Sequence, residues 1–236
     1  METDAAPQAE VEPLPRASDF FRSWTVATTV AYGVTGLISM LFFRSLENQR
    51  FDSKEFLPAL SLLMMLSGGL IALAQRLALR RAFRESACWG WVLVTVLAKL
   101  AGGLVVEVVR AMALPGGLPK SEGEVVLCIV LLGIMELGTW IAQAVYLVRV
   151  TGSTRFGWWP GVSLAALIAS GLGSALFSYS VSSSLGGSWA FFESLPGRGV
   201  LSVVLSLLQG AGVGLSLGWV LSRWLLRAGR LRRGPQ

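Results

Sequence analysis

Six long apolar segments recur along the chain, and their length limits the folds that it can adopt. They lie near residues 24–43, 57–79, 88–110, 125–148, 158–180 and 200–225. An α-helix of about 20 residues, at about 1.5 Å per residue, crosses the hydrocarbon core of a bilayer. In lipid only helices and closed barrels satisfy their own backbone hydrogen bonds, and these segments are too long for barrel strands. The sequence therefore predicts an all-α polytopic membrane protein with six transmembrane helices.

The composition agrees with this class and argues against others. Charged residues make up only 14% of the chain, whereas they are about a quarter of a soluble domain. The absence of histidine excludes histidine-based catalysis and histidine metal sites. No phosphate or metal motif is present, and the basic residues form no aromatic-basic stripe despite a pI of about 10.0. We therefore expect no enzyme activity, no cofactor, no metal and no nucleic-acid partner.

The distribution of Lys and Arg predicts the orientation, because cytoplasmic segments carry an excess of these residues. With the N-terminus inside, the cytoplasmic set comprises Arg16, Arg22, Arg76, Arg80, Arg81, Arg84, Arg149, Arg155, Arg223, Arg227, Arg230, Arg232 and Arg233. The opposite set is smaller and comprises Arg44, Arg50, Lys54, Arg110, Lys120 and Arg198. We expect a protein of the bacterial inner membrane with both termini in the cytoplasm.

The two ends of the chain differ from the apolar part between them. Residues 1–18 are acidic and contain prolines, which predicts a disordered cytoplasmic tail. Residues 228–236 are a basic cytoplasmic tail, explained by topology or by contact with anionic lipid or an acidic partner. Residues 19–227 form the transmembrane domain. Its longest connection, 181–199, is too apolar for a free loop and is either a lid or an interfacial anchor.

Six tryptophans fall near the predicted inner interface, where amphipathic rings anchor helices. They are Trp24, Trp89, Trp91, Trp158, Trp159 and Trp224. We interpret them as an interfacial belt, with a ligand cage as the alternative.

A shift of 68 residues superimposes one part of the chain on another. The stretch "AQRLALRR" at 74–81 matches "AQAVYLVR" at 142–149, and Trp91 then matches Trp159. These matches predict two parallel copies of one helix hairpin, at about 68–110 and 136–178. A weaker third echo is "GVGLSLGWVLSRWLLR" in the last segment.

These residues resemble a known pattern. The stretches "AQRLALRR…WGW" and "AQAVYLVR…GWW" are similar to the repeats "AQWLVLR…GWW" of a group of uncharacterised multi-pass bacterial membrane proteins. The resemblance covers roughly residues 68–175 and implies no activity.

Two opposite charges are predicted near the membrane midplane. Lys99 lies in the middle of the third segment and Glu136 in the middle of the fourth, and consecutive helices are usually neighbours. A lone charge at that depth costs at least about 2.5–3.5 kcal/mol. We therefore expect Lys99 and Glu136 to form an ion pair. Two interpretations stay open: a structural pair that fixes helix register, or part of a path for a solute, an ion or a proton.

Further polar side chains extend from this pair. Thr139 and Gln143 share the helix face of Glu136 and continue it toward the inside. Arg110 shares the face of Lys99 toward the outside, and Glu107 lies close to Arg110 in the sequence. We take these four residues as a candidate polar stripe.

Small residues at four-residue spacing predict faces for close helix packing, because burial from water does not drive helix association in lipid. Gly210, Gly214 and Gly218 form one such row, and another runs from Gly161 through Ala165 and Ala169 to Gly173. The sequence leaves open whether a row packs within the chain or forms the interface of a homo-oligomer.

Two functional classes follow from these features. The repeat and the midplane pair favour a transport or permeation subunit. The rows of small residues, the few polar groups and the cytoplasmic tails favour a non-enzymatic assembly, scaffold or regulatory protein that holds a membrane or cytoplasmic partner.

Overall fold

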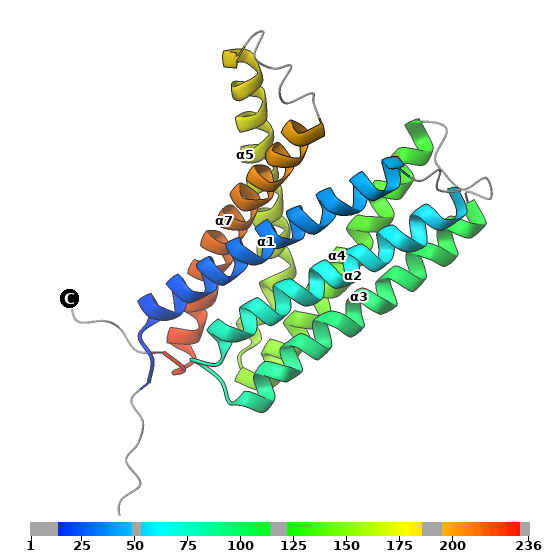
Figure 1. Ribbon diagram of the computed structural model, residues 1–236. Coiled ribbons are helices and arrows are strands. Elements are labelled where there is room, and N and C mark those ends of the chain that lie inside the picture. Colours follow the sequence, from blue (N-terminus) through cyan, green and yellow to red (C-terminus); the bar gives the residue numbers. More distant parts are fainter. Residues whose placement is uncertain (1–13, 49–52, 114–121, 186–194, 232–236) are drawn as a thin grey trace, which may run out of the picture.

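The computed structural model describes residues 14–48, 53–113, 122–185 and 195–231 (Figure 1). In chain order its elements are α1 (Ala17–Asn48), α2 (Ser53–Leu79), α3 (Glu85–Ala113), α4 (Glu122–Thr151), the 3-10 helix η1 (Thr154–Trp158), α5 (Trp159–Leu185) and α7 (Leu195–Arg227). All of these elements are helical, and six of the helices are long and apolar enough to cross a membrane. The predicted all-α class with six apolar segments is confirmed.

Three helices extend into stretches expected to be a tail or a connection: α1, α5, and α7, which starts at Leu195 inside the predicted 181–199 connection. α1 starts at Ala17, so the last two residues of the stretch predicted as a disordered tail are helical. Phe20 and Trp24 in its first turns are completely buried, and packing of these rings extends the helix. α5 continues to Leu185, into the predicted 181–199 connection. The remaining parts of the tails and of that connection, at 1–13, 232–236 and 186–194, lie outside the described residues.

The six helices form a closed ring. Each helix from α1 to α4 packs against the next one, α5 packs against α7, and α7 returns to α1. Figure 1 shows the first and last helices crossing side by side. Arg81 donates a hydrogen bond to the Asp19 carbonyl of α1 (3.2 Å), and Arg230 donates one to the Val150 carbonyl of α4 (3.4 Å). The start of α1, the end of α7, the turn after α2 and the end of α4 therefore all lie at one end of the ring.

Close contact between α1 and α7 runs along the predicted glycine row. A Cβ atom at Gly214 would lie 3.1 Å from the Thr25 carbonyl oxygen and 3.2 Å from the Thr25 Cα. Thr25 Oγ1 also donates a hydrogen bond to the Gly214 carbonyl (3.3 Å). A Cβ at Gly210 would lie 2.5 Å from the Cβ of Tyr32, and one at Gly218 would lie 2.8 Å from Trp24 Cδ1. Glycine is therefore what lets the two backbones approach.

The second predicted row, on α5, does not pack against another helix of the chain. Gly161, Ala165, Ala169 and Gly173 are all exposed. A Cβ atom at Gly161 or Gly173 would have nothing within 4 Å. Of the two alternatives that the sequence leaves open for this row, packing within the chain is not observed among the described residues, because the row turns away from α4 and α7.

The protein exposes large apolar side chains and buries several polar ones among its apolar core residues. Large apolar side chains such as Val26, Leu93 and Leu97 are more than half exposed. The buried polar and charged residues are Thr28, Gln75, Thr95, Lys99, Thr139, Gln143, Ser163, Ser170 and Ser222. Water would make such an exterior costly, whereas lipid suits it. The six apolar helices and this exterior indicate an integral membrane protein.

Candidate functional site: a polar cavity inside the helix ring

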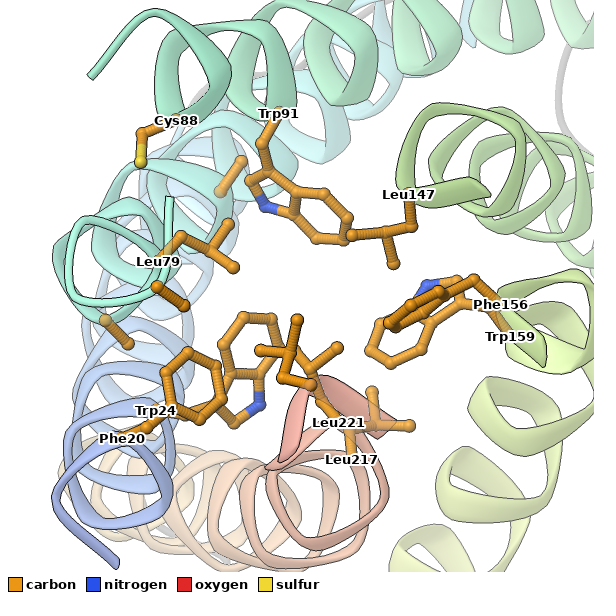
Figure 2. Packing of buried hydrophobic residues seen from close by; sticks show 14 of the residues in the cluster. Phe20, Trp24, Leu79, Cys88, Trp91, Leu147, Phe156, Trp159, Leu217 and Leu221 are labelled. Atoms are coloured by element: carbon orange, nitrogen blue, oxygen red, sulfur yellow. The ribbon is translucent and has the colours of Figure 1, made fainter. Parts of the chain in front are cut away.

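Three tryptophans meet at the end of the ring where the helical domain begins and ends. Trp24 of α1, Trp91 of α3 and Trp159 of α5 are at most 1% exposed. Their ring centroids lie 6.1 to 6.3 Å apart, and each pair has an edge-to-face arrangement (Figure 2). Such aromatic contacts are favourable beyond the apolar area that they bury. We call these three residues the tryptophan floor.

The burial of these three residues corrects the prediction that six tryptophans form an interfacial belt. Trp24, Trp91 and Trp159 lie in the core because each occupies the ring-facing side of its helix. Trp89 and Trp158, 50% and 75% exposed, have the exposure that an interfacial residue needs.

A cavity of about 480 Å³ lies above the floor and is lined by residues from all six helices. On α1 and α3 all lining residues come after the floor tryptophan in the sequence, and on α5 the lining begins at Trp159 itself. The tryptophan floor therefore closes one end of this cavity, which we call the ring cavity. Its volume lies within the range of small-molecule sites, which is about 300–1,000 Å³.

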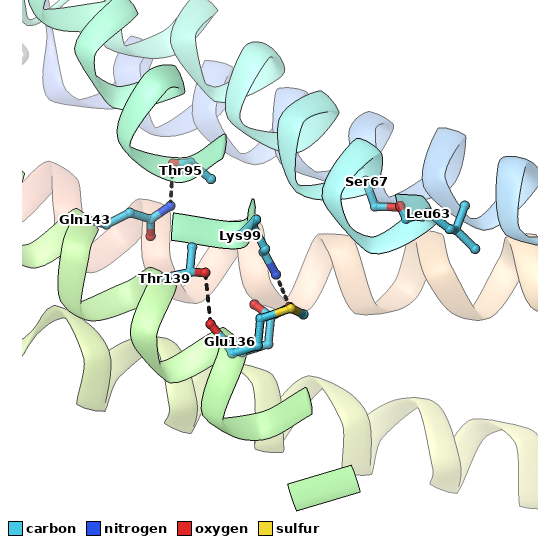
Figure 3. Close-up of polar contacts among 8 residues, drawn as sticks. Leu63, Ser67, Thr95, Lys99, Glu136, Thr139 and Gln143 are labelled. Atoms are coloured by element: carbon cyan, nitrogen blue, oxygen red, sulfur yellow. Dashed lines mark hydrogen bonds and ion pairs between the residues drawn. The ribbon is translucent and has the colours of Figure 1, made fainter. Parts of the chain in front are cut away.

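Lys99 and Glu136 form an ion pair on the wall of the ring cavity. Lys99 Nζ on α3 contacts Glu136 Oε1 on α4, and Figure 3 shows the two side chains pointing toward one another. The Lys99 side chain is 8% exposed and the Glu136 side chain is 25% exposed. The ammonium is therefore the more enclosed partner, and the carboxylate side chain keeps more accessible surface.

Gly68 of α2 makes room for this lysine. A Cβ atom at Gly68 would lie 3.0 Å from Lys99 Cγ and 3.0 Å from Lys99 Cε, closer than nearly all real contacts of a Cβ. Gly68 also occupies the position that matches Glu136 after the 68-residue shift. Glycine at position 68, which matches Glu136 in the repeat, therefore leaves the space that the Lys99 side chain occupies in the ion pair.

Below the ion pair, Gln143 joins three helices. Its Nε2 donates a hydrogen bond to Thr95 Oγ1 (2.9 Å), and its Oε1 accepts one from Trp159 Nε1 (3.0 Å). The matched residue Gln75 donates a longer bond to Thr28 Oγ1 (3.4 Å). The amide of Gln143 thus uses both its donor and its acceptor to hold the floor and the cavity wall together.

Two hydroxyl groups on the cavity wall have unused hydrogen-bonding capacity. Thr35 Oγ1 and Ser163 Oγ are buried and have no hydrogen-bond partner within the described part of the chain. A buried polar group without a partner is costly. These hydroxyls can bond to a molecule that enters the ring cavity.

The other predicted site residues fall in different places. Thr139 and Gln143 line the ring cavity, whereas Glu107 is half-buried and does not. The Arg110 side chain lies outside the described residues. Val106 of α3 packs with Leu131 in an apolar cluster, and the stripe toward Arg110 stays a prediction.

Residues of α1 also line the ring cavity, although the repeat predicted from the 68-residue shift includes only two hairpins. The pattern W-x3-[ST]-x2-A-x4-G-L occurs in α1, α3 and α5, and it begins each time at a floor tryptophan. Its members are Trp24, Thr28, Ala31, Gly36 and Leu37 in α1, Trp91, Thr95, Ala98, Gly103 and Leu104 in α3, and Trp159, Ser163, Ala166, Gly171 and Leu172 in α5. A search with this pattern would have found Trp24 and Thr28.

Comparison of the chain with protein-family models, with curated proteins and with solved structures finds no match.

Proposed function

We propose that the protein is a non-enzymatic transport or permeation subunit of a bacterial inner membrane, with the ring cavity as its solute site. The ring cavity with its buried ion pair carries this proposal. Charges within a membrane-spanning helix are expensive, and they typically mark a substrate or ion pathway. A purely structural pair needs no cavity of about 480 Å³ beside it.

The proposed orientation has the tryptophan floor and both termini on the cytoplasmic side. Arg76, Arg80 and Arg81 lie at the floor end of α2, and Arg149 lies at the matching end of α4. This end is therefore rich in arginine, as cytoplasmic ends are. In this orientation the tryptophan floor closes the ring cavity toward the cytoplasm, and we propose that the cavity opens toward the outside.

We further propose that the ring consists of three copies of one helix pair. The first copy is α2 with α3, and the second is α4 with α5. The third copy pairs the last helix, α7, with the first helix, α1. The shared pattern on α1, α3 and α5 supports this proposal. So do the leucines Leu79, Leu147 and Leu225, which are at most 2% exposed and precede an arginine by two residues in α2, α4 and α7.

A scaffold role is the second candidate, and the exposed row on α5 favours it. Gly161, Ala165, Ala169 and Gly173 offer a flat strip on which a helix of another protein or of a second copy can lie. Such a role would leave the ring cavity without a solute.

Cysteine labelling of intact cells distinguishes these roles. In a background with Cys88 and Cys128 replaced by alanine, Ser39→Cys places a thiol on the cavity wall and Leu97→Cys places one on the lipid-facing surface. A membrane-impermeant maleimide should label position 39 and leave position 97 unlabelled. Absence of labelling at 39, and at Ser67→Cys deeper in the cavity, would rule out a site open to the outside.

A further inference from the structure

The wall of the ring cavity is charged on one side only. Among the lining residues the charged side chains are Lys99 and Glu136, which lie on the adjacent helices α3 and α4. In the pattern shared by three helices, the residue eight positions after the floor tryptophan is Tyr32 on α1, Lys99 on α3 and Leu167 on α5. All three of these residues line the cavity. The repeated framework therefore carries a different group on each side.

The charge balance of the wall restricts the net charge of a ligand. Lys99 and Glu136 neutralise one another, so the described wall has no net charge. A ligand with a net charge would leave one charge without a counter-charge at membrane depth, which is unfavourable. The ring cavity therefore suits a molecule whose charges sum to zero.

The adjacency of the two protein charges favours a ligand that carries both signs. A ligand ammonium can approach the more accessible Glu136 carboxylate, while a ligand carboxylate approaches the Lys99 ammonium. Each protein charge then keeps a counter-charge, and the contacts are charge-assisted hydrogen bonds. An uncharged ligand can form hydrogen bonds to these groups but supplies no counter-charge to either of them.

Apolar side chains line other parts of the cavity, beside polar ones such as Ser67 and Gln209. Leu63, Met64 and Ile71 line the cavity from α2, next to α3, and Val213 and Leu217 line it from α7 across the ring. Tyr32 adds an aromatic surface from α1. A ligand with its charges at α3 and α4 thus directs its remaining part toward aliphatic and aromatic side chains.

We propose that the ring cavity binds a small zwitterion with an apolar side group, the chemical class of the apolar α-amino acids. Its carboxylate binds Lys99 and its ammonium binds Glu136, so that the ligand inserts between the partners of the ion pair. This inference rests on the proposed transport function and names the class of solute.

Binding to the purified full-length protein in detergent tests the class directly. Isothermal titration compares leucine and phenylalanine with three analogues of leucine: 4-methylpentanoate, 3-methylbutylamine and 4-methylpentanamide. We expect an amino acid to bind about tenfold or more tighter than the analogues with one charge or none, because each lost charge-assisted bond weakens binding. Equal binding of any analogue, or no binding of either amino acid, overturns the proposal.

Variants of the pair locate the site. Glu136→Gln keeps the shape of the side chain and should weaken amino-acid binding about tenfold. It should strengthen 4-methylpentanoate binding, because the Lys99 ammonium then lacks its counter-charge in the protein. Leu97→Ala on the lipid-facing surface is the control and should change neither. Amino-acid binding that Glu136→Gln leaves unchanged places the ligand elsewhere. Thermal unfolding checks that each variant is folded, and if Glu136→Gln is not, the analogue series on the unchanged protein decides alone.

The outcomes also separate this inference from the function on which it rests. If no amino acid binds but Ser39→Cys is labelled from outside, the solute class is wrong and the open cavity stands. If Ser39→Cys and Ser67→Cys both stay unlabelled, the transport function falls as well.

Discussion

Gly68 of α2 lies against the aliphatic part of Lys99 of α3, so closely that a Cβ at position 68 would stand 3.0 Å from Lys99 Cγ and Cε. Substitution with Gly68→Val should therefore displace the lysine from Glu136 and destabilise the protein by about 1–3 kcal/mol, the usual cost of overpacking. Thermal unfolding in detergent measures this. Gly138→Val on α4, where a Cβ meets nothing within 4 Å, is the matched control. Equal losses in both variants would show that the contact with Lys99 is unimportant.

The ion pair itself predicts coupling between Lys99 and Glu136. Either single leucine substitution should cost about 3–5 kcal/mol, because it leaves one buried charge without a partner. The double leucine variant should recover much of this loss, and the exchanged pair, Lys99→Glu with Glu136→Lys, should also recover. The monodisperse fraction after solubilisation and the unfolding midpoint report the effects. Independent, additive losses would contradict the coupling.

The same double leucine variant separates the two interpretations of the pair. If the pair only fixes helix register, the folded variant should still take up solute in proteoliposomes. If the pair binds the solute, the folded variant should be inactive. The proposed function predicts the second result.

The contact between α1 and α7 predicts a strong effect of a large side chain at Gly214. Gly214→Leu should force Thr25 away and lower the folded yield, because a Cβ already lies 3.1 Å from backbone there. Gly133→Leu on α4 has open space at its Cβ and should be tolerated. The comparison uses gel filtration of the two variants purified side by side. A Gly214→Leu protein as abundant and monodisperse as the Gly133→Leu protein would disprove close packing along this row.

Removal of one indole side chain from the tryptophan floor should open the closed end of the ring cavity. Trp91→Ala should destabilise the protein by about 3–5 kcal/mol. It should also open the cavity on the proposed cytoplasmic side, so that an impermeant maleimide added to inside-out vesicles labels Thr95→Cys only in the Trp91→Ala background. Trp219→Ala, at a residue 54% exposed on the lipid-facing surface, is the control. Unchanged protection of Thr95→Cys would show that Trp91 does not close the cavity.

The proposed orientation predicts the side on which the connection between α4 and η1 lies. Ser153 lies there and is partly exposed. In the cysteine-free background, Ser153→Cys should react with an impermeant maleimide only after the membrane is opened. Reaction in intact cells would reverse the orientation.

Sequence reasoning went furthest where a property is local to one helix. Hydropathy identified the six apolar segments, because membrane-spanning length is a property of consecutive residues. The matching positions of Lys99 and Glu136 along two neighbouring helices follow from counting residues, and the structure places their side chains in contact. The start of α1 was misjudged because Phe20 and Trp24 extend that helix through contacts with distant residues.

The sequence by itself determined the class of fold, the number of apolar helices and the positions of the two charges along their helices, since these depend on composition and on the 1.5 Å rise per residue. Only the tertiary structure decided which face of each helix turns inward. Hydropathy does not distinguish a tryptophan at the membrane interface from one that faces the inside of the helix ring. The contact of Trp24, Trp91 and Trp159 with one another is therefore seen only in the tertiary structure. The closing contact joins α1 to α7, the two most distant helices in the chain, and the glycine row predicts a packing face on α7 without naming its partner.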